Sequence, residues 1–333
     1  MQNLERRGKC LHAMPSRTVG PMPCGRKGEK QMFDAILVLV AIIAFGFIAR
    51  ALSLVGEGAE KELSSFVYYV SMPCLILFKL ASTPLTGQHL SLLLLNGAAI
   101  AVTIAVVCAL YLLGIVKGKF AAALLLCSFW GNIIFMGFPA AQAYFGQPAI
   151  ADAAVIAFIY NLIIFTAGIL LLGWMAGKKG NDFSIRKLST NTVLYSCVIG
   201  ALLSVSGIQL PIVLSDTLSL VGATTVPLAL FSMGAFLYGK KVGQKTHQVA
   251  ILFAAKMALF PLVMLCLAFL FGMRGYVVQL SFMEALMPIA VTNFVVAREF
   301  SLDAQLVAEA TVVTTLASLP LLFLFGPISA FLA

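Results

Sequence analysis

Ten stretches of this chain are apolar over a length that can cross a lipid bilayer, and this restricts the fold more than any other feature. A membrane-spanning helix needs about 20 apolar residues, and lipid offers no partners for exposed backbone groups. The stretches cover residues 33–50, 63–81, 90–116, 120–144, 150–176, 190–209, 217–239, 248–272, 276–297 and 304–330. Their short connections leave no room for a soluble domain. The sequence therefore predicts an all-α polytopic membrane protein with ten transmembrane helices.

The composition excludes the main classes of soluble protein. The chain is 61% hydrophobic and 11% charged, whereas soluble domains are about 45–50% apolar and about 25% charged. The net charge of +9 does not indicate a nucleic-acid partner, because it is unevenly distributed. Residues 1–31 hold seven basic and two acidic residues, which is +5 of that total.

Lysine and arginine are concentrated in alternate loops. The loops after spans 1, 3, 5, 7 and 9 hold twelve of them: Arg50, Lys61, Lys117, Lys119, Lys178, Lys179, Arg186, Lys187, Lys240, Lys241, Lys245 and Arg298. The loops after the even-numbered spans hold two, Lys79 and Arg274. Because basic loops stay on the cytoplasmic side, we expect both termini outside and the central linker in the cytoplasm. The lack of long loops and organelle signals fits a bacterial inner membrane.

The N-terminal segment departs from this charge pattern. Residues 1–31 would place seven basic groups on the outer side. We expect this segment to be a disordered basic tail or the product of a start codon assigned upstream of Met32. The rest divides into a first five-helix unit over 32–176, a cytoplasmic linker over 177–190 and a second five-helix unit over 191–333.

Matched positions in the two halves indicate an internal repeat. Pro73 and Pro227 are 154 residues apart, and so are Gly46 and Gly200. Residues 143–146 match residues 298–301 at an offset of 155. A repeat of five spans is odd, so the second copy enters the membrane inverted, as is typical of secondary transporters. We expect Pro73 and Pro227 to break their helices at equivalent places.

Spans 4 and 9 carry helix-breaking residues near their centres. Span 4 contains Gly131, Asn132, Gly137 and Pro139, and span 9 contains Pro288, Thr292 and Asn293. Proline removes a backbone donor, and glycine permits the dihedrals beside a break. Unwound backbone at bilayer depth is tolerated where protein or a wet cavity satisfies it. Two facing breaks would offer half-helix N-termini and the amide N–H groups of Asn132 and Asn293 to an anion.

Three further polar residues lie within spans. Lys256 in span 8 is either a lysine that snorkels to the interface or a fixed cation near the breaks. Glu284, one turn before Pro288, is either a proton-titrating partner of Lys256 or a residue of the outer vestibule. Asn161 in span 5 is a second candidate for contact with substrate, or a hydrogen-bond partner of a neighbouring helix.

Sequence signatures of the usual enzymes are missing from the chain. It contains no HExxH, GxSxG or P-loop motif, and its three histidines lack ligand spacing. We therefore expect no enzymatic activity, no cofactor and no metal.

Several short motifs occur together between about Phe33 and the C-terminus. They are Ser71-Met72-Pro73, Gly131-Asn132, Gly137-Phe138-Pro139, residues 226–234 (VPLALFSMG), Met287-Pro288 and Ala317-Ser318-Leu319-Pro320. In combination they resemble the auxin efflux carrier family of membrane transporters. The motifs of spans 4 and 7 are fairly specific in combination. The central linker is short, so the chain resembles the short bacterial form of the family.

The resemblance implies an inverted-repeat fold similar to that of sodium–proton antiporters and bile-acid symporters. Spans 1, 2, 6 and 7 would form a scaffold, and spans 3–5 and 8–10 a moving transport domain with crossed helices 4 and 9. Family members move carboxylates, such as auxin in plants and malate or malonate in bacteria. Relatives of this fold often pair as homodimers through the scaffold.

These observations favour a secondary transporter that moves a small organic anion by alternating access of the elevator type. The alternative is a membrane sensor or regulatory subunit with the same fold and no flux. The residues leave open whether a proton, a sodium ion or the membrane potential alone drives transport.

Overall fold

Helices form the regular secondary structure of the described residues, apart from one isolated β-bridge. The computed structural model describes residues 26–83, 86–177, 192–239, 243 and 245–332. The expected tail over 1–31 lies mostly outside this range, and helix α2 begins at Arg26, inside that tail. The expected linker over 177–190 lies outside the described residues except for Gly177.

The helices of the first half follow the predicted spans closely. They are α2 (Arg26–Ala51), α3 (Ala59–Phe66), the π-helical turn η1 (Val67–Ser71), α4 (Met72–Ala81), α5 (Gly87–Leu112), α6 (Gly118–Phe129), the π-helical turn η2 (Ile133–Gly137), α7 (Phe138–Phe145), α8 (Ala149–Ile163), the π-helical turn η3 (Ile164–Gly168) and α9 (Ile169–Met175). Span 4 is thus divided between α6 and the continuous η2–α7 segment.

The second half shows a similar division in span 9. Its elements are α11 (Thr192–Ser206), α12 (Ile212–Ala223), α13 (Thr225–Leu237), α14 (Thr246–Ala254), the π-helical turn η4 (Ala255–Leu259), α15 (Phe260–Leu270), α16 (Tyr276–Ala285), α17 (Thr292–Glu299) and α18 (Ala304–Ala330). Six of the described helices are long and apolar enough to cross a membrane, and four shorter apolar helices accompany them.

Three of the π-helical turns directly precede a proline. Pro73, Pro139 and Pro261 are each the second residue of the α-helix that follows η1, η2 and η4. Proline crowds the carbonyl four residues earlier, and a π-turn widens the helix at that place. The helix around Pro73 therefore continues from Ala59 to Ala81 without a break. Pro227 likewise lies inside α13, after an interruption of one residue at Thr224.

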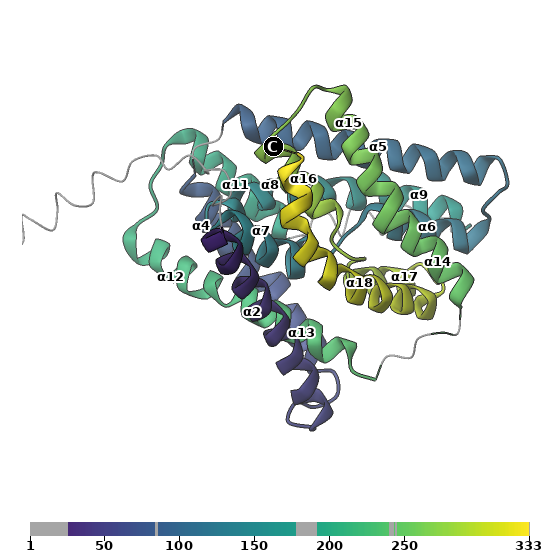
Figure 1. Cartoon of the computed structure of the whole chain (residues 1–333), viewed down its shortest axis with the longest axis horizontal. Helices are drawn as coiled ribbons and strands as arrows, with labels where there is room; N and C mark the ends of the chain where they lie inside the picture. Colours follow the sequence, from purple (N-terminus) through teal and green to yellow (C-terminus); the bar gives the residue numbers. More distant parts are fainter. Residues whose placement is uncertain (1–25, 84–85, 178–191, 240–242, 244, 333) are drawn as a thin grey trace, which may run out of the picture.

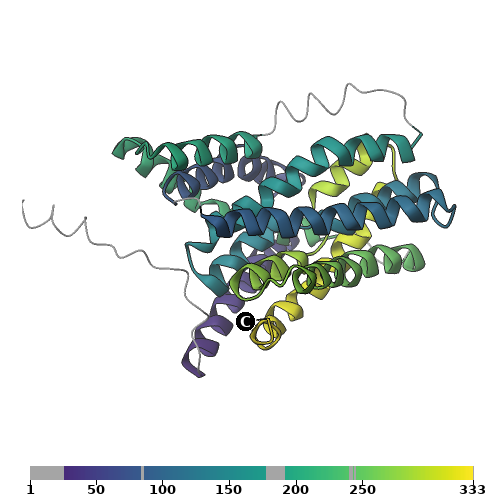
Figure 2. The ribbon, with the colours of Figure 1, turned by 90° about the horizontal axis from the view of Figure 1, so that it is seen from above.

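The helices form two groups (Figure 1). In the α2 group, α2 and α3 pack on α13, while α4 packs on α11 and α12. In the crossover group, α5 packs on α8 and α15, α6 on α9, and α18 on α14 and α17. Figure 2 shows the long helix α5, in blue, along one side of the crossover group.

Glycine permits a very close approach within the α2 group. A Cβ at Gly46 of α2 would lie 2.0 Å from the carbonyl oxygen of Phe231, and one at Gly234 of α13 would lie 1.8 Å from that of Ile43. Gly200 of α11, the position 154 residues after Gly46, packs on Leu80 of α4. The matched glycines therefore lie at two equivalent helix contacts.

Candidate functional site at the crossing of the broken helices

The two broken spans cross and pair through their unwound backbones. The Asn132 N–H donates to the carbonyl of Pro288 at 2.7 Å, and the Ala290 N–H donates to the carbonyl of Trp130 at 3.2 Å. These bonds form an antiparallel bridge between Gly131 and Ile289. Backbone groups that proline and glycine release from the helices are thus satisfied by each other, as buried groups must be.

Four half-helix ends meet at this crossing. Helices α6 and α16 end there, at Phe129 and Ala285, and η2 and α17 begin there, at Ile133 and Thr292. Helix N-termini carry partial positive charge and C-termini partial negative charge. The crossing therefore combines two positive and two negative partial charges in a buried region.

Asn132 is oriented towards the α2 group. Its side chain is 2% exposed, and its amide nitrogen lies 4.0 Å from the sulfur of Met233 on α13. A thioether is a weak acceptor, so this amide can be redirected to a carboxylate at little cost. Sequence reasoning did not single out Met233, although it belongs to the motif over residues 226–234.

The side-chain amide of Asn293 is hydrogen-bonded to the backbone at the end of α6. Its amide nitrogen donates to the carbonyls of Leu126 and Trp130, both at 3.2 Å. Its side-chain oxygen has no hydrogen-bond partner among the described residues. The amide donors that we expected to face a substrate instead satisfy the last carbonyls of a half-helix. In this structure Asn293 holds the crossing together.

Lys256 lies beside the crossing and is fully buried, which is incompatible with snorkelling. Its ammonium nitrogen donates to the carbonyl of Ala285 at 2.6 Å and lies 4.9 Å from the ring centroid of Phe260. An ideal Cβ on Gly131 would be 3.2 Å from the same nitrogen. The cation thus stands at the C-terminus of α16, where the partial charge is negative.

Glu284 lies in the last turn of α16 and is also fully buried. Neither of its carboxyl oxygens has a hydrogen-bond partner in the described part of the chain. An ideal Cβ on Gly137 would be 2.0 Å from one of these oxygens, so glycine is required beside the carboxyl group. The structure therefore brings Gly131 and Gly137 against the two charged side chains.

The other predicted residues lie at different distances from the crossing. Pro288 is part of it, and Thr292 is the first residue of α17. Pro139 is in the first turn of α7, after η2. Asn161 of α8 is buried, but its amide bonds to the carbonyl of Ala157 in its own helix. Pro73 and Pro227 lie in the α2 group.

Thr314 of α18 also supports the crossing. Its hydroxyl oxygen accepts the N–H of Ile289 at 3.2 Å and donates to the carbonyl of Ala310. Thr314 therefore bonds both within its own helix and to the unwound segment of span 9.

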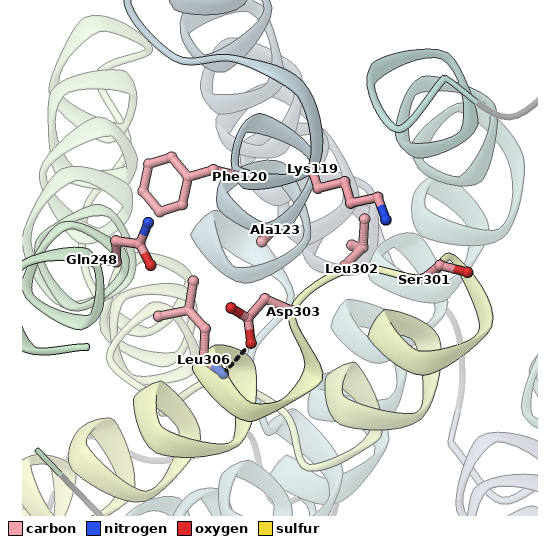
Figure 3. Close-up of a pocket in the computed structure, with 8 residues that line it drawn as sticks. All are labelled: Lys119, Phe120, Ala123, Gln248, Ser301, Leu302, Asp303 and Leu306. Atoms are coloured by element: carbon pink, nitrogen blue, oxygen red, sulfur yellow. Dashed lines mark hydrogen bonds between the residues drawn. The ribbon is translucent and has the colours of Figure 1, made fainter. Parts of the chain in front are cut away.

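A separate cavity of about 400 Å³ opens near the start of α6 (Figure 3). Its lining comes from α6, α14, the segment before α18 and the first turn of α18: Lys119, Phe120, Ala123, Gln248, Ser301, Leu302, Asp303 and Leu306. None of the predicted site residues lines it. It lies at the end of the crossover group where α6, α14 and α18 begin.

One of the lining residues, Asp303, belongs to an ion pair. Asp303 accepts a hydrogen bond from the N–H of Leu306 and pairs with the ammonium of Lys245. Burial alone would raise the pKa of Asp303, but the hydrogen bonds from Lys245 and Leu306 outweigh it, so the pKa lies below its usual value.

Comparison with known proteins matches this architecture to a family. A family described as "Membrane transport protein" matches residues 31–325. An "Uncharacterized transporter" of Methanocaldococcus jannaschii is 27% identical, over 88% of this chain and 97% of the relative. A Rhizobium meliloti protein named "Putative malonate transporter" is 24% identical, over 85% of this chain and 91% of the relative.

Plant relatives match over a shorter region. The "Probable auxin efflux carrier component 5b" of Oryza sativa subsp. japonica is 29% identical, over 44% of this chain and 41% of the relative. The family match covers most of the chain, including both broken spans. The chain therefore belongs to the auxin efflux carrier family of membrane transport proteins, and it is a multi-pass integral membrane transporter rather than an enzyme.

Proposed function

We propose that this protein is a secondary carrier of a small organic anion and that the carboxylate binds at the helix crossing. The paired backbones of residues 130–132 and 288–290 are the observation that carries this proposal. Half-helix N-termini beside such a crossing attract an anion without the cost of an additional buried cation. The Asn132 amide, which faces the thioether of Met233, is the first side chain that we assign to the carboxylate.

The helix packing supports a ten-span, inverted-repeat architecture. Span 1 packs on span 7 and span 6 packs on span 2, as α2 on α13 and α11 on α4. Ser71 and Thr225, which are 154 positions apart, bring their hydroxyl oxygens within 3.2 Å of each other. Such contacts are expected where an axis of internal symmetry passes between repeat partners.

The two helix groups support alternating access of the elevator type. In this proposal the α2 group is the scaffold, and the crossover group carries the anion past it. Val67 and Ala229 of the α2 group meet Phe135 of the crossover group in a small apolar cluster. An apolar contact without directional bonds can shift its register more easily than a hydrogen-bonded one. The scaffold is also the surface that we propose for a homodimer.

Transport in proteoliposomes tests the proposal. The full chain would be reconstituted and offered radiolabelled malate, malonate and an aromatic carboxylate, with and without proton and sodium gradients. Saturable uptake of one anion is expected, since one relative is named a malonate transporter and others auxin carriers. Binding without flux would instead favour a sensor with this fold.

Asn132→Ala tests the proposed contact with substrate. Loss of a hydrogen bond to a charged group costs about 1.5–3 kcal/mol, or roughly 10- to 150-fold in affinity. Gln279→Ala is the matched control, because it removes another buried amide, on α16, which bonds to the carbonyl of Ser329. Equal half-saturation concentrations in Asn132→Ala and the parent protein would contradict the contact.

A further inference from the structure

Lys256 and Glu284, which carry opposite charges when ionised, are both fully buried at the crossing, and no hydrogen bond joins them in the described residues. Lys256 gives its short hydrogen bond to the Ala285 carbonyl, and both oxygens of Glu284 remain without partners in the described residues. A buried carboxylate without hydrogen-bond donors is costly, and the Glu284 carboxyl group therefore offers an acceptor oxygen to which a proton can add.

The titratable groups around Glu284 come from two other helices and its own. The η4 turn contributes Lys256, and α8 contributes Tyr160, whose buried hydroxyl also lacks a partner among the described residues. Two turns earlier on α16 stands Tyr276. The η2 turn presents Gly137, and α5 presents Asn96, which bonds to Ser281 of α16 and does not titrate.

Polar side chains continue from this region to the far end of α16. The Tyr276 hydroxyl donates to Asp152 of α8 at 2.7 Å, and Asp152 lies 3.2 Å from the ring of His89 at the start of α5. Asn96 and Ser281, joined at 2.8 Å, lie between this cluster and Glu284 along the helices. This end of the molecule holds the loops that are poor in lysine and arginine.

We propose that Glu284 is the proton-coupling group of the carrier, loaded from the end of α16 that holds Tyr276, Asp152 and His89. The inference rests on the proposed function. With Glu284 ionised, its charge cancels that of Lys256, and a bound carboxylate leaves the site net negative. With Glu284 protonated, the charge of Lys256 balances that of one substrate carboxylate. Proton and anion therefore favour each other's binding and move in the same direction.

The proton step involves no other chemistry. A proton from water adds to a lone pair of the Glu284 carboxylate and forms one O–H bond. The reverse step on the other side of the membrane breaks that bond and returns the proton to water. No electron is transferred, and the carboxylate is regenerated in each cycle.

Proteoliposomes can separate coupling from transport. Counterflow of malonate, measured without a proton or sodium gradient, reports whether the carrier moves the anion at all. Accumulation under an inward gradient of about one pH unit, with the membrane potential clamped at zero, reports coupling, and one coupled proton then supports up to about tenfold accumulation. Glu284→Gln keeps the shape of the side chain but removes the titration. Glu309→Gln is the control, because Glu309 is equally buried but lies near the Lys245 backbone.

We expect Glu284→Gln to lose accumulation, and its counterflow to become independent of pH, because the variant has no group that titrates at this position. Glu309→Gln should accumulate malonate like the parent. The inference would be overturned if Glu284→Gln still accumulated malonate under the proton gradient. It would also be overturned if the parent accumulated malonate only under a sodium gradient. Either result would leave the carrier proposal standing. Absence of malonate counterflow in the parent would overturn the carrier proposal for this anion and this inference with it. Failure of Glu284→Gln to show counterflow at any pH would also count against the inference.

Discussion

At the scale of single residues, the site depends on two glycines that admit charged side chains. Gly137→Ala would place a Cβ 2.0 Å from a Glu284 oxygen that is buried on all sides. Overpacking of this kind costs about 1–3 kcal/mol. We expect thermal unfolding of the purified protein in detergent to shift to lower temperature by several degrees.

Gly97→Ala is the matched control for that variant. A Cβ there would meet Ile159 at 3.6 Å, which is an ordinary contact. In the interior of α5, alanine should then be neutral or stabilising by about 0.5–1 kcal/mol. Similar unfolding temperatures for the two variants would mean that Glu284 does not pack against Gly137.

Asn293 provides a second prediction at this scale. Its amide donates to two backbone carbonyls, so Asn293→Ala should destabilise the protein by about 1–3 kcal/mol through unsatisfied buried groups. Asn293→Asp should cost more, because an ionised carboxylate has acceptors alone and would face those same carbonyls. Denaturation curves that rank Asp above Ala in stability would show that this bonding pattern is wrong.

At the scale of elements, the Lys245–Asp303 pair and the N-terminus of α18 make a testable unit. The pKa of Asp303 is lowered in the folded protein. Because the pKa of Asp303 is lower in the folded protein than in the unfolded chain, where it is about 3.9, the ionised carboxylate stabilises the fold above that pH. This stabilisation is lost as the pH falls through the pKa of the folded protein. Asp303→Asn should therefore flatten the loss of stability below about pH 4.

Asp303→Ala separates the ion pair from the helix cap. Asparagine can still accept the Leu306 N–H, whereas alanine cannot. We expect Asp303→Ala to be less stable than Asp303→Asn at neutral pH by about 0.5–2 kcal/mol. Unfolding temperatures measured across pH for both variants check the two contributions. If the stability of Asp303→Asn and of the parent falls equally as the pH is lowered, the ion pair does not contribute to the acid dependence of stability.

The elements also show which features of the fold and site could be predicted from the sequence. The breaks at Gly131–Asn132 and Pro288 follow from residue chemistry, and their place in the structure is as expected. We expected Pro73 to break its helix, but the π-turn before it lets the helix continue. The partners of Asn293 were also beyond reach, because the carbonyls that it meets are more than 160 positions away. Contacts across such distances depend on packing rather than on local pattern.

At the scale of the whole molecule, the proposed carrier requires the crossover group to move against the α2 group. Phe135 and Ala229 pack together across this boundary. With the native cysteines replaced, we expect a disulfide between Phe135→Cys and Ala229→Cys to stop anion uptake almost completely, because it fixes one position of a rigid-body movement. Reduction of the disulfide should restore uptake.

A cross-link inside the α2 group shows whether the effect is specific. The hydroxyl oxygens of Ser71 and Thr225 lie 3.2 Å apart, and both belong to helices of this group. If that group is a rigid scaffold, a disulfide between Ser71→Cys and Thr225→Cys should leave uptake close to that of the reduced form. Uptake that survives the first cross-link, or that both cross-links block equally, would contradict a movement between the two groups. Transport would then have to come from local rearrangement at the crossing, where the charges of Lys256 and Glu284 already lie beside the broken helices.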